Sequence, residues 1–119
     1  LSVLVVQGRT LGGSTVPSFC LAFRPRAAIL DAWEQRFGLD GVGSALMAPY
    51  FEAIERVLGV VATSEAELNA NNARVRQGAS VLGLRGRLPQ HSRVACVGCG
   101  YCALGCAYDR KNDALTVLL

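Results

Sequence analysis

The chain reads Gly8-Arg9-Thr10-Leu11-Gly12-Gly13-Ser14-Thr15 directly after its first apolar run, and this glycine-rich turn sets the expectations for the fold. The preceding run, Leu1–Val6, is short and β-branched, which predicts a buried strand. Diphosphates bind to unhindered backbone amides and hydroxyls, because a Cβ would block their approach. The turn is therefore a candidate diphosphate site. Adjacent glycines also occur in ordinary tight turns, so the glycines alone leave both interpretations open.

Composition indicates one domain, or part of one, with more apolar surface than so small a unit needs. The 119 residues are 51% hydrophobic, and domains cluster near 100–150 residues. No apolar run approaches the 18 residues of a membrane span, so the excess suggests surface that other protein covers. The chain also begins without Met and stops within the apolar run 117–119. We therefore expect an internal fragment of a longer polypeptide.

Charge argues against a nucleic-acid partner. The net charge is +3, and the eleven arginines and the single lysine, Lys111, are scattered along the chain. The eight aromatic residues do not accompany them, whereas nucleic-acid surfaces combine a dense basic stripe with aromatic side chains. A solvated basic face is the better interpretation.

Periodicity predicts a mostly α-helical segment with long loops and few short strands. The expected helices span residues 25–38, 49–58 and 65–82, and a fourth begins at Asp109. Ser64 and Glu67 form a capping box before the third helix. The asparagines at 69–72 are poor helix formers and predict a bend or a functional contact there. Residues 83–93, rich in glycine and arginine, indicate a loop.

Four cysteines near the C-terminus form the second candidate site: Cys96, Cys99, Cys102 and Cys106. Their spacing, C-x2-C-x2-C-x3-C, is that of the bacterial ferredoxin run, which points thiolates at an iron–sulfur cluster. Ala107 replaces the proline that usually follows, and no second run is present. Cys20, the remaining thiol, could contribute only if the fold brings it near. Zinc, a disulfide and buried free thiols stay open as alternatives.

The motifs together resemble a known family. The glycine-rich turn, followed by Arg24-Pro25 and then by Trp33 and Phe37-Gly38, resembles the flavin-binding signature of glucose-methanol-choline (GMC) oxidoreductases. The later C-x2-G-C-x4-K segment, Cys102 to Lys111, is similar to the branch that contains long-chain alcohol oxidases, cholesterol oxidases and related sugar dehydrogenases. The resemblance spans essentially the whole chain.

The resemblance implies an α/β parent protein with a Rossmann-like FAD-binding domain and a substrate domain. Residues 1–25 would belong to the FAD-binding region, residues 26–95 to a helical scaffold, and residues 96–119 to a cysteine-rich segment leading into a helix. The residues implied to contact FAD are Gly8, Arg9, Gly12, Gly13, Ser14 and Thr15, with Ser18 where the family often has Asn beside the flavin ring.

The implied activity is oxidation of a CH–OH group by hydride transfer to flavin. The family's catalytic histidine would lie beyond Leu119, so we expect no catalytic residue here, and His91 is expected to be a surface loop residue. The implied partners are an alcohol substrate, the rest of the polypeptide and an electron-acceptor protein. A cluster would favour cytoplasmic assembly. The rival functions are an iron–sulfur electron-transfer module built on residues 96–106 and a structural domain with a disulfide or zinc.

Overall fold

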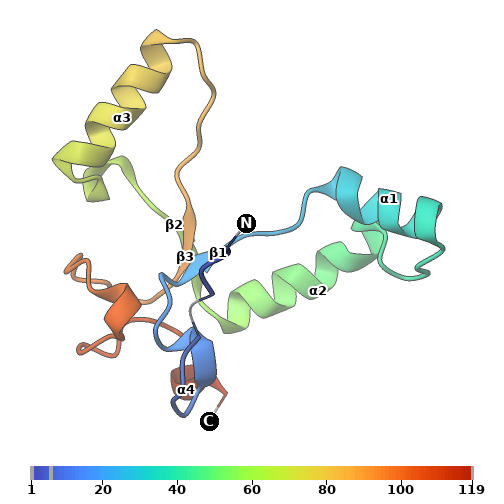
Figure 1. Ribbon diagram of the computed structural model, residues 1–119, viewed down its shortest axis with the longest axis horizontal. Coiled ribbons are helices and arrows are strands. Elements are labelled where there is room, and N and C mark those ends of the chain that lie inside the picture. Colours follow the sequence, from blue (N-terminus) through green and yellow to red (C-terminus); the bar gives the residue numbers. More distant parts are fainter. Residues whose placement is uncertain (1, 6, 119) are drawn as a thin grey trace.

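Three short strands pair at the centre of the computed structural model, which describes residues 2–5 and 7–118 (Figure 1). They are β1 (Leu21–Ala22), β2 (Val60–Ala62) and β3 (Gln90–Ser92). The sheet is antiparallel with the order β1-β3-β2, so the last strand in sequence lies in the middle. His91 stands opposite Leu21 on one side and Val61 on the other. The sheet thus joins segments up to 70 residues apart.

The remaining elements extend from this small sheet as separate arms (Figure 1). The helices are α1 (Ala27–Phe37), α2 (Ser44–Val57), α3 (Ala70–Val81) and α4 (Ala114–Val117), and the 3-10 turns are η1 (Gly13–Thr15), η2 (Glu65–Glu67) and η3 (Cys102–Leu104). Helices α1 and α2 form one arm, and α3 with its return loop forms a second. The expectation of a mostly helical segment with few short strands is confirmed.

Side chains of α1 cap the first turn of α2. The Asp31 carboxylate accepts a hydrogen bond from the Ser44 amide (2.8 Å), and Glu34 accepts one from Gly43 (3.2 Å). The amide of Ser44 also lowers the pKa of Asp31. Carboxylates suit this position because the first amides of a helix have no partner within it and carry partial positive charge. The α1–α2 arm is therefore a helical hairpin with a defined turn.

The second helix differs from the prediction, which started it at Pro49. Helix α2 begins at Ser44, and Pro49 lies inside it. The interior proline removes one backbone donor, and the helix nevertheless continues to Val57. Its start is set by the carboxylates of α1, a tertiary contact that the local pattern does not display.

The third helix is interrupted where the asparagines predicted a bend. The Ser64–Glu67 capping box is present, but Leu68 is extended (φ −71°, ψ 124°). Asn69 then caps α3 by accepting a hydrogen bond from the Asn72 amide (2.8 Å). Glu67 also pairs with Arg93 at 2.5 Å, so η2 is tied to the end of β3 while α3 projects away (Figure 1).

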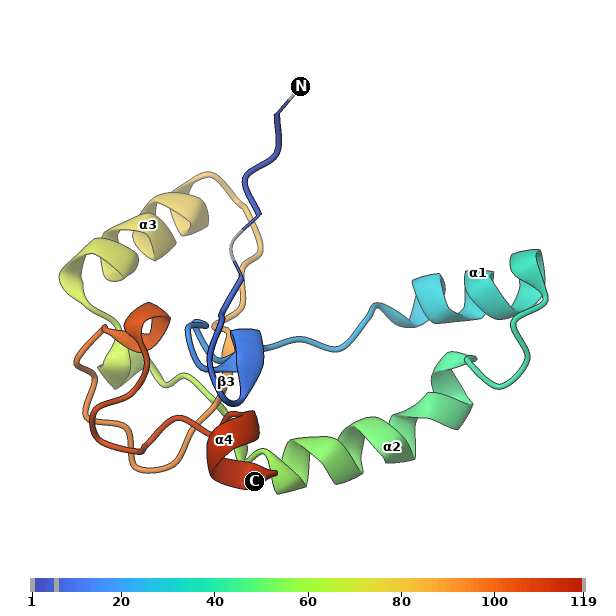
Figure 2. The same cartoon turned by 60° about the horizontal axis from the view of Figure 1, so that its bottom comes forward.

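Three further expectations were wrong in their details. Residues 83–93 contain β3 in addition to a loop. The final helix is capped by Asp113, which accepts hydrogen bonds from Leu115 (3.0 Å) and Thr116 (3.1 Å), and Asp109 instead adopts a left-handed conformation. Of the predicted strand at residues 1–6, the part that the structure describes, residues 2–5, is exposed and forms no strand. That stretch runs away from the rest of the chain (Figure 2).

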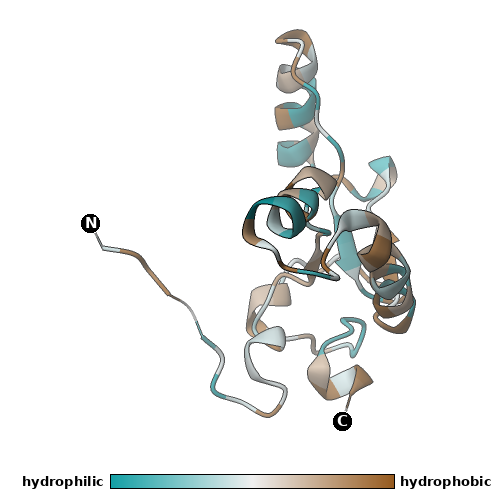
Figure 3. Ribbon diagram, turned by 90° about the vertical axis from the view of Figure 1, so that its right-hand side faces the viewer, coloured by the Kyte–Doolittle hydropathy of each residue, from teal (hydrophilic) through white to brown (hydrophobic). Residues whose placement is uncertain are grey.

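The described residues bury little apolar surface of their own. Cys20 (8% exposed) and Leu30 (5%) are the buried apolar side chains among them. The Cα radius of gyration is 17.0 Å, against roughly 13.5 Å for a compact domain of this length. Figure 3 shows hydrophobic residues along the N-terminal stretch, and both hydrophobic and hydrophilic residues along the helices. None of the helices in the described ranges has the length and apolarity to cross a membrane.

Gly59 gives a test of the packing around the sheet. It has φ +56°, and a Cβ there would lie 2.7 Å from Asn112 Nδ2 and 3.3 Å from Val94 Cγ2. We expect Gly59→Ala to destabilise the full-length protein by about 1–2 kcal/mol, because both the backbone and the neighbours resist the methyl group. Chemical denaturation measures the change.

Gly78→Ala is the matched control. Gly78 lies in α3 and a Cβ there meets nothing within 4 Å, so alanine should stabilise the helix by about 0.5–1 kcal/mol. Equal effects of the two substitutions would contradict the packing described for Gly59.

Candidate functional site

The glycine-rich turn forms a tight loop around η1. Gly12 (φ 82°) and Gly13 (φ 60°) both adopt left-handed conformations, which favour glycine because it has no Cβ. Gly8 packs against the same loop, since a Cβ there would lie 2.7 Å from Gly13 O and from Pro17 Cγ. At Gly13, by contrast, a Cβ would meet nothing within 4 Å. The backbone of the turn is thus open to an approaching group at Gly13.

The hydroxyl groups of the turn hold its own shape. Ser14 Oγ accepts a hydrogen bond from the Gly8 amide (3.0 Å). Thr15 Oγ1 donates to Gly12 O (2.6 Å). Ser18 Oγ donates to Thr15 O (2.8 Å) and accepts from the Cys20 amide (3.3 Å). The hydroxyls of Thr15 and Ser18 therefore act on the backbone of this segment, whereas the side chain of Arg9 is exposed.

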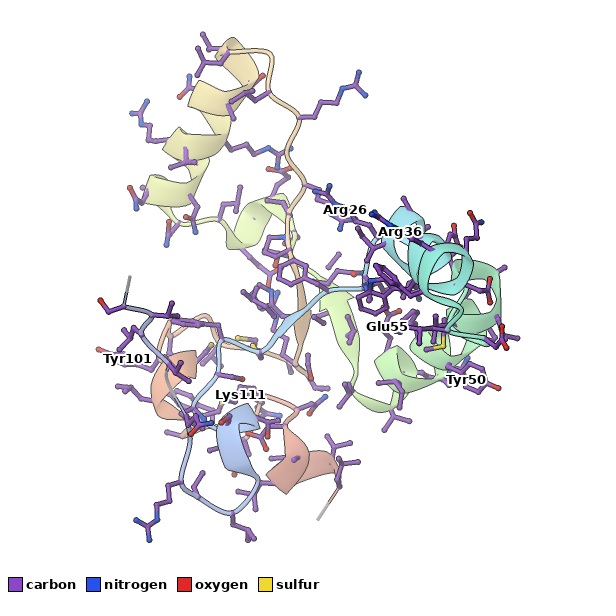
Figure 4. All side chains as sticks on the ribbon, turned by 45° about the vertical axis from the view of Figure 1, so that its right-hand side comes forward. Arg26, Arg36, Tyr50, Glu55, Tyr101 and Lys111 are labelled. Carbon is purple, nitrogen blue, oxygen red and sulfur yellow. The ribbon has the colours of Figure 1, made fainter. Side chains whose placement is uncertain are left out.

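Lys111 lies beneath the turn and is almost completely buried, at 2% exposed. Its ammonium group donates hydrogen bonds to the carbonyl oxygens of Val16, Ser18 (3.2 Å) and Cys102 (3.1 Å). Figure 4 shows it between the N-terminal turn and the C-terminal segment. In the sequence, Lys111 is visible only as the last residue of the C-x2-G-C-x4-K motif. The one other indication of a special role is that it is the single lysine in a chain with eleven arginines.

Helix α4 provides a second connection to the turn. The Ala114 amide donates to Thr15 Oγ1 (3.0 Å), a bond across 99 residues of sequence. A Cβ on Gly12 would lie 3.1 Å from both the amide nitrogen and the Cβ of Leu115. The turn and α4 lie side by side in two views (Figures 1 and 2). The turn and the start of α4, with Lys111, therefore form one site.

The cysteine run winds through several left-handed residues: Ala95, Gly98, Gly100, Gly105 and Asp109. All five cysteines are free thiols, and Cys96 and Cys99 are exposed. Within residues 2–5 and 7–118, no three cysteine, histidine or acidic side chains gather into a metal-binding group. In this arrangement the run does not form a ligand set for a cluster or for zinc. The iron–sulfur site at Cys96, Cys99, Cys102 and Cys106 stays a prediction.

The fold brings Cys20 to the cysteine run. Burial, followed by the neighbouring Cys102, raises the pKa of Cys20 to about 12. At the end of the run, Cys106 Sγ accepts a hydrogen bond from the Arg110 amide (3.3 Å). That bond is the main cause of a lowered pKa at Cys106. The two thiols thus differ in opposite directions from an ordinary cysteine.

The sequence suggested that His91 lies on a surface loop. The structure places it instead in the central strand, β3. It is half-buried, and its Nδ1 lies 2.8 Å from Thr63 Oγ1. Burial, and then the positive charge of Arg93, lowers the pKa of His91, which favours the neutral ring. His91 lines a hollow of about 1350 Å³ together with Cys20, Cys96 and Cys102. The residues of the glycine-rich turn do not line this hollow, so it is distinct from the candidate diphosphate site.

Comparison with known families decides the assignment, since residues 2–119 match the family model described as GMC oxidoreductase. The chain belongs to the GMC oxidoreductase family. The N-terminal domain of this family binds FAD. The sequence-based resemblance to GMC oxidoreductases is thereby confirmed.

Individual relatives are distant and much longer than this GMC segment. Two uncharacterised GMC-type oxidoreductases, from two strains of Mycobacterium tuberculosis, are each 29% identical over 110 residues, which cover 92% of this chain and 18% of theirs. The long-chain-alcohol oxidase FAO4A of Arabidopsis thaliana is 24% identical over 111 residues, 93% of this chain and 15% of its own. The chain therefore spans less than a fifth of each of these relatives. No solved structure gives a significant match.

The opposite pKa shifts predict different reactivities for two thiols. Only the thiolate reacts with alkylating reagents, so a raised pKa lowers the reactive fraction of Cys20 at pH 8 and a lowered pKa increases it at Cys106. In the native protein we expect iodoacetamide to modify Cys106 much faster than Cys20. Time-resolved peptide mass spectrometry measures both rates. In urea-unfolded protein the two rates should converge, and a difference that persisted there would refute the structural explanation.

Proposed function

We propose that the full-length protein is an FAD-dependent oxidoreductase that oxidises the CH–OH group of an alcohol, sterol or sugar. This chain would supply part of the FAD site, and the residues for proton removal would lie elsewhere in the polypeptide. Support comes from the family match over residues 2–119 and from a relative named as a long-chain-alcohol oxidase. The observation that carries the proposal is the glycine-rich turn, whose backbone is open at Gly13.

The turn suits a diphosphate because left-handed Gly13 leaves backbone accessible where a side chain would otherwise stand. We infer that FAD is contacted by the residues implied by the family motif: Gly8, Arg9, Gly12, Gly13 and Ser14, with Thr15 and Ser18. Arg9 is exposed and offers a positive charge to the phosphates. The hydroxyls of Thr15 and Ser18 shape the loop through the hydrogen bonds described above.

FAD, when bound, would supply the acceptor for a hydride from the substrate's carbinol carbon. This chain's own contribution is to bind and orient that group. The base that takes the hydroxyl proton would come from outside residues 1–119, since His91 lies away from the turn and burial lowers its pKa.

The α1–α2 hairpin supports the inference that the rest of the polypeptide packs against this chain. Its exposed large apolar side chains are Ile29, Trp33, Phe37, Leu46, Tyr50, Ile54 and Val57. The bidentate pair between Arg24 and Glu55 (2.6 and 2.5 Å) fixes the base of the hairpin. Exposed apolar area of this kind marks an interaction site. We propose that this face is covered in the full-length protein.

A flavin measurement tests the proposal. Purified full-length protein should show flavin absorption, and its bleaching on addition of alcohols, sterols or sugars identifies the substrate class. Gly13→Val should lower the affinity for FAD by about tenfold or more, because a branched side chain would fill the open approach to the turn. Fluorescence titration of the apo-protein with FAD gives the dissociation constant.

Gly38→Val is the matched control for backbone strain. Gly38 ends α1 with φ +62°, nearly the same as Gly13, and a Cβ there also meets nothing within 4 Å. The two substitutions therefore carry similar backbone strain at different places. Equal losses of FAD affinity, or full-length wild-type protein that binds no flavin, would refute the assignment of the turn.

A further inference from the structure

The ammonium group of Lys111 has a complete set of acceptors. A lysine offers three N–H donors and no acceptor, and the structure provides three backbone carbonyls: Val16 O, Ser18 O and Cys102 O. The carboxylate of Asp113, itself 7% exposed, lies 4.0 Å away and supplies the opposite charge. A buried charge is costly unless it is paired and hydrogen-bonded. This geometry satisfies both conditions.

Two of the three acceptors belong to the segment that closes the glycine-rich turn, 93 and 95 residues before Lys111 in sequence. The backbone of Lys111 is itself fixed, because it pairs with Arg93 in an isolated antiparallel bridge at the end of β3. The lysine therefore joins a point on the central sheet to the segment that closes the turn. The Thr15–Ala114 bond and the packing of Gly12 against Leu115 are further long-range contacts of the turn.

The direction of these bonds also matters. The C=O and N–H of one peptide unit point in opposite directions in a trans peptide. By holding Ser18 O, Lys111 fixes the orientation of the peptide unit between Ser18 and Phe19. By holding Val16 O, it fixes the residue at the C-terminal end of η1. Lys111 thus fixes the backbone that follows the left-handed residues Gly12 and Gly13, at Val16 and Ser18.

We propose that Lys111 is the positioning residue of the FAD site: its buried ammonium group holds the glycine-rich turn in the shape that receives the diphosphate. This inference rests on the proposed function of the turn. Lys111 touches the backbone of the turn and acts through it.

The test compares Lys111→Met with wild type in the full-length protein. Methionine keeps much of the length and apolar stem of lysine but donates no hydrogen bond. We expect the dissociation constant for FAD to rise about tenfold to a hundredfold, in line with loss of a charged hydrogen-bonding group. The visible circular dichroism of the bound flavin at saturating FAD should also change, because an altered turn would change the orientation and protein environment of the flavin.

Arg110→Met is the control, since it removes one positive charge at the neighbouring, exposed position. It should leave both the FAD affinity and the flavin circular dichroism unchanged. Lys111→Gln is measured in parallel because its amide retains two donors and preserves the fold if methionine does not. We expect it to weaken FAD binding in the same direction.

The outcomes separate the two proposals. If wild type binds FAD while Lys111→Met or Lys111→Gln binds it with unchanged affinity and circular dichroism, the positioning role is overturned and the assignment of the turn stands. If the variants lose thermal stability alone, Lys111 is structural only and the inference fails. If wild type binds no FAD, both proposals fail together.

Discussion

The contact on which this structure most depends is the buried ammonium of Lys111 against three backbone carbonyls. Backbone carbonyls are usually satisfied within helices and sheets, and the glycine-rich turn offers few such partners. The Lys111 ammonium group therefore supplies hydrogen-bond donors that a neighbouring strand or helical turn would otherwise provide. It does so from a fixed base, because the lysine pairs with the residue that follows the central strand. The two ends of the sequence are joined at one point as a result.

The other elements do not pack around a hydrophobic core among the described residues. The sheet has strands of two or three residues, and the helices extend from it with their apolar faces exposed. Polar contacts define the arms: carboxylates of α1 cap α2, and Glu67 ties η2 to Arg93. Two of these contacts satisfy backbone amides at the start of a helix, and the third is a half-buried ion pair, so each fixes the direction of an arm. The described residues are therefore shaped mainly by hydrogen bonds, with most of their large apolar side chains exposed.

The sequence predicted what is encoded locally. Gly38 marked the end of α1, Ser64 and Glu67 the capping box, and the asparagines at 69–72 the break before α3. The family was also visible in the motif around Gly12 and Gly13. The features that the sequence did not predict depend on residues far apart in the chain. Strand β3 forms because residues 21–22 and 60–62 pair with it. Helix α2 starts at Ser44 because the Asp31 carboxylate accepts a hydrogen bond from its amide. For the same reason, the burial of Lys111 and the proximity of Cys20 to Cys102 could not be read from spacing.

The bond between Thr15 and Ala114 has a consequence for biosynthesis. A ribosome adds roughly 5–20 residues per second, so the loop at Gly12 emerges about 5–20 s before the helix that braces it. During that interval the loop lacks both Lys111 and α4, and its backbone is free to sample other conformations. The turn would therefore reach the shape proposed to receive a diphosphate only after the segment through α4 has been synthesised.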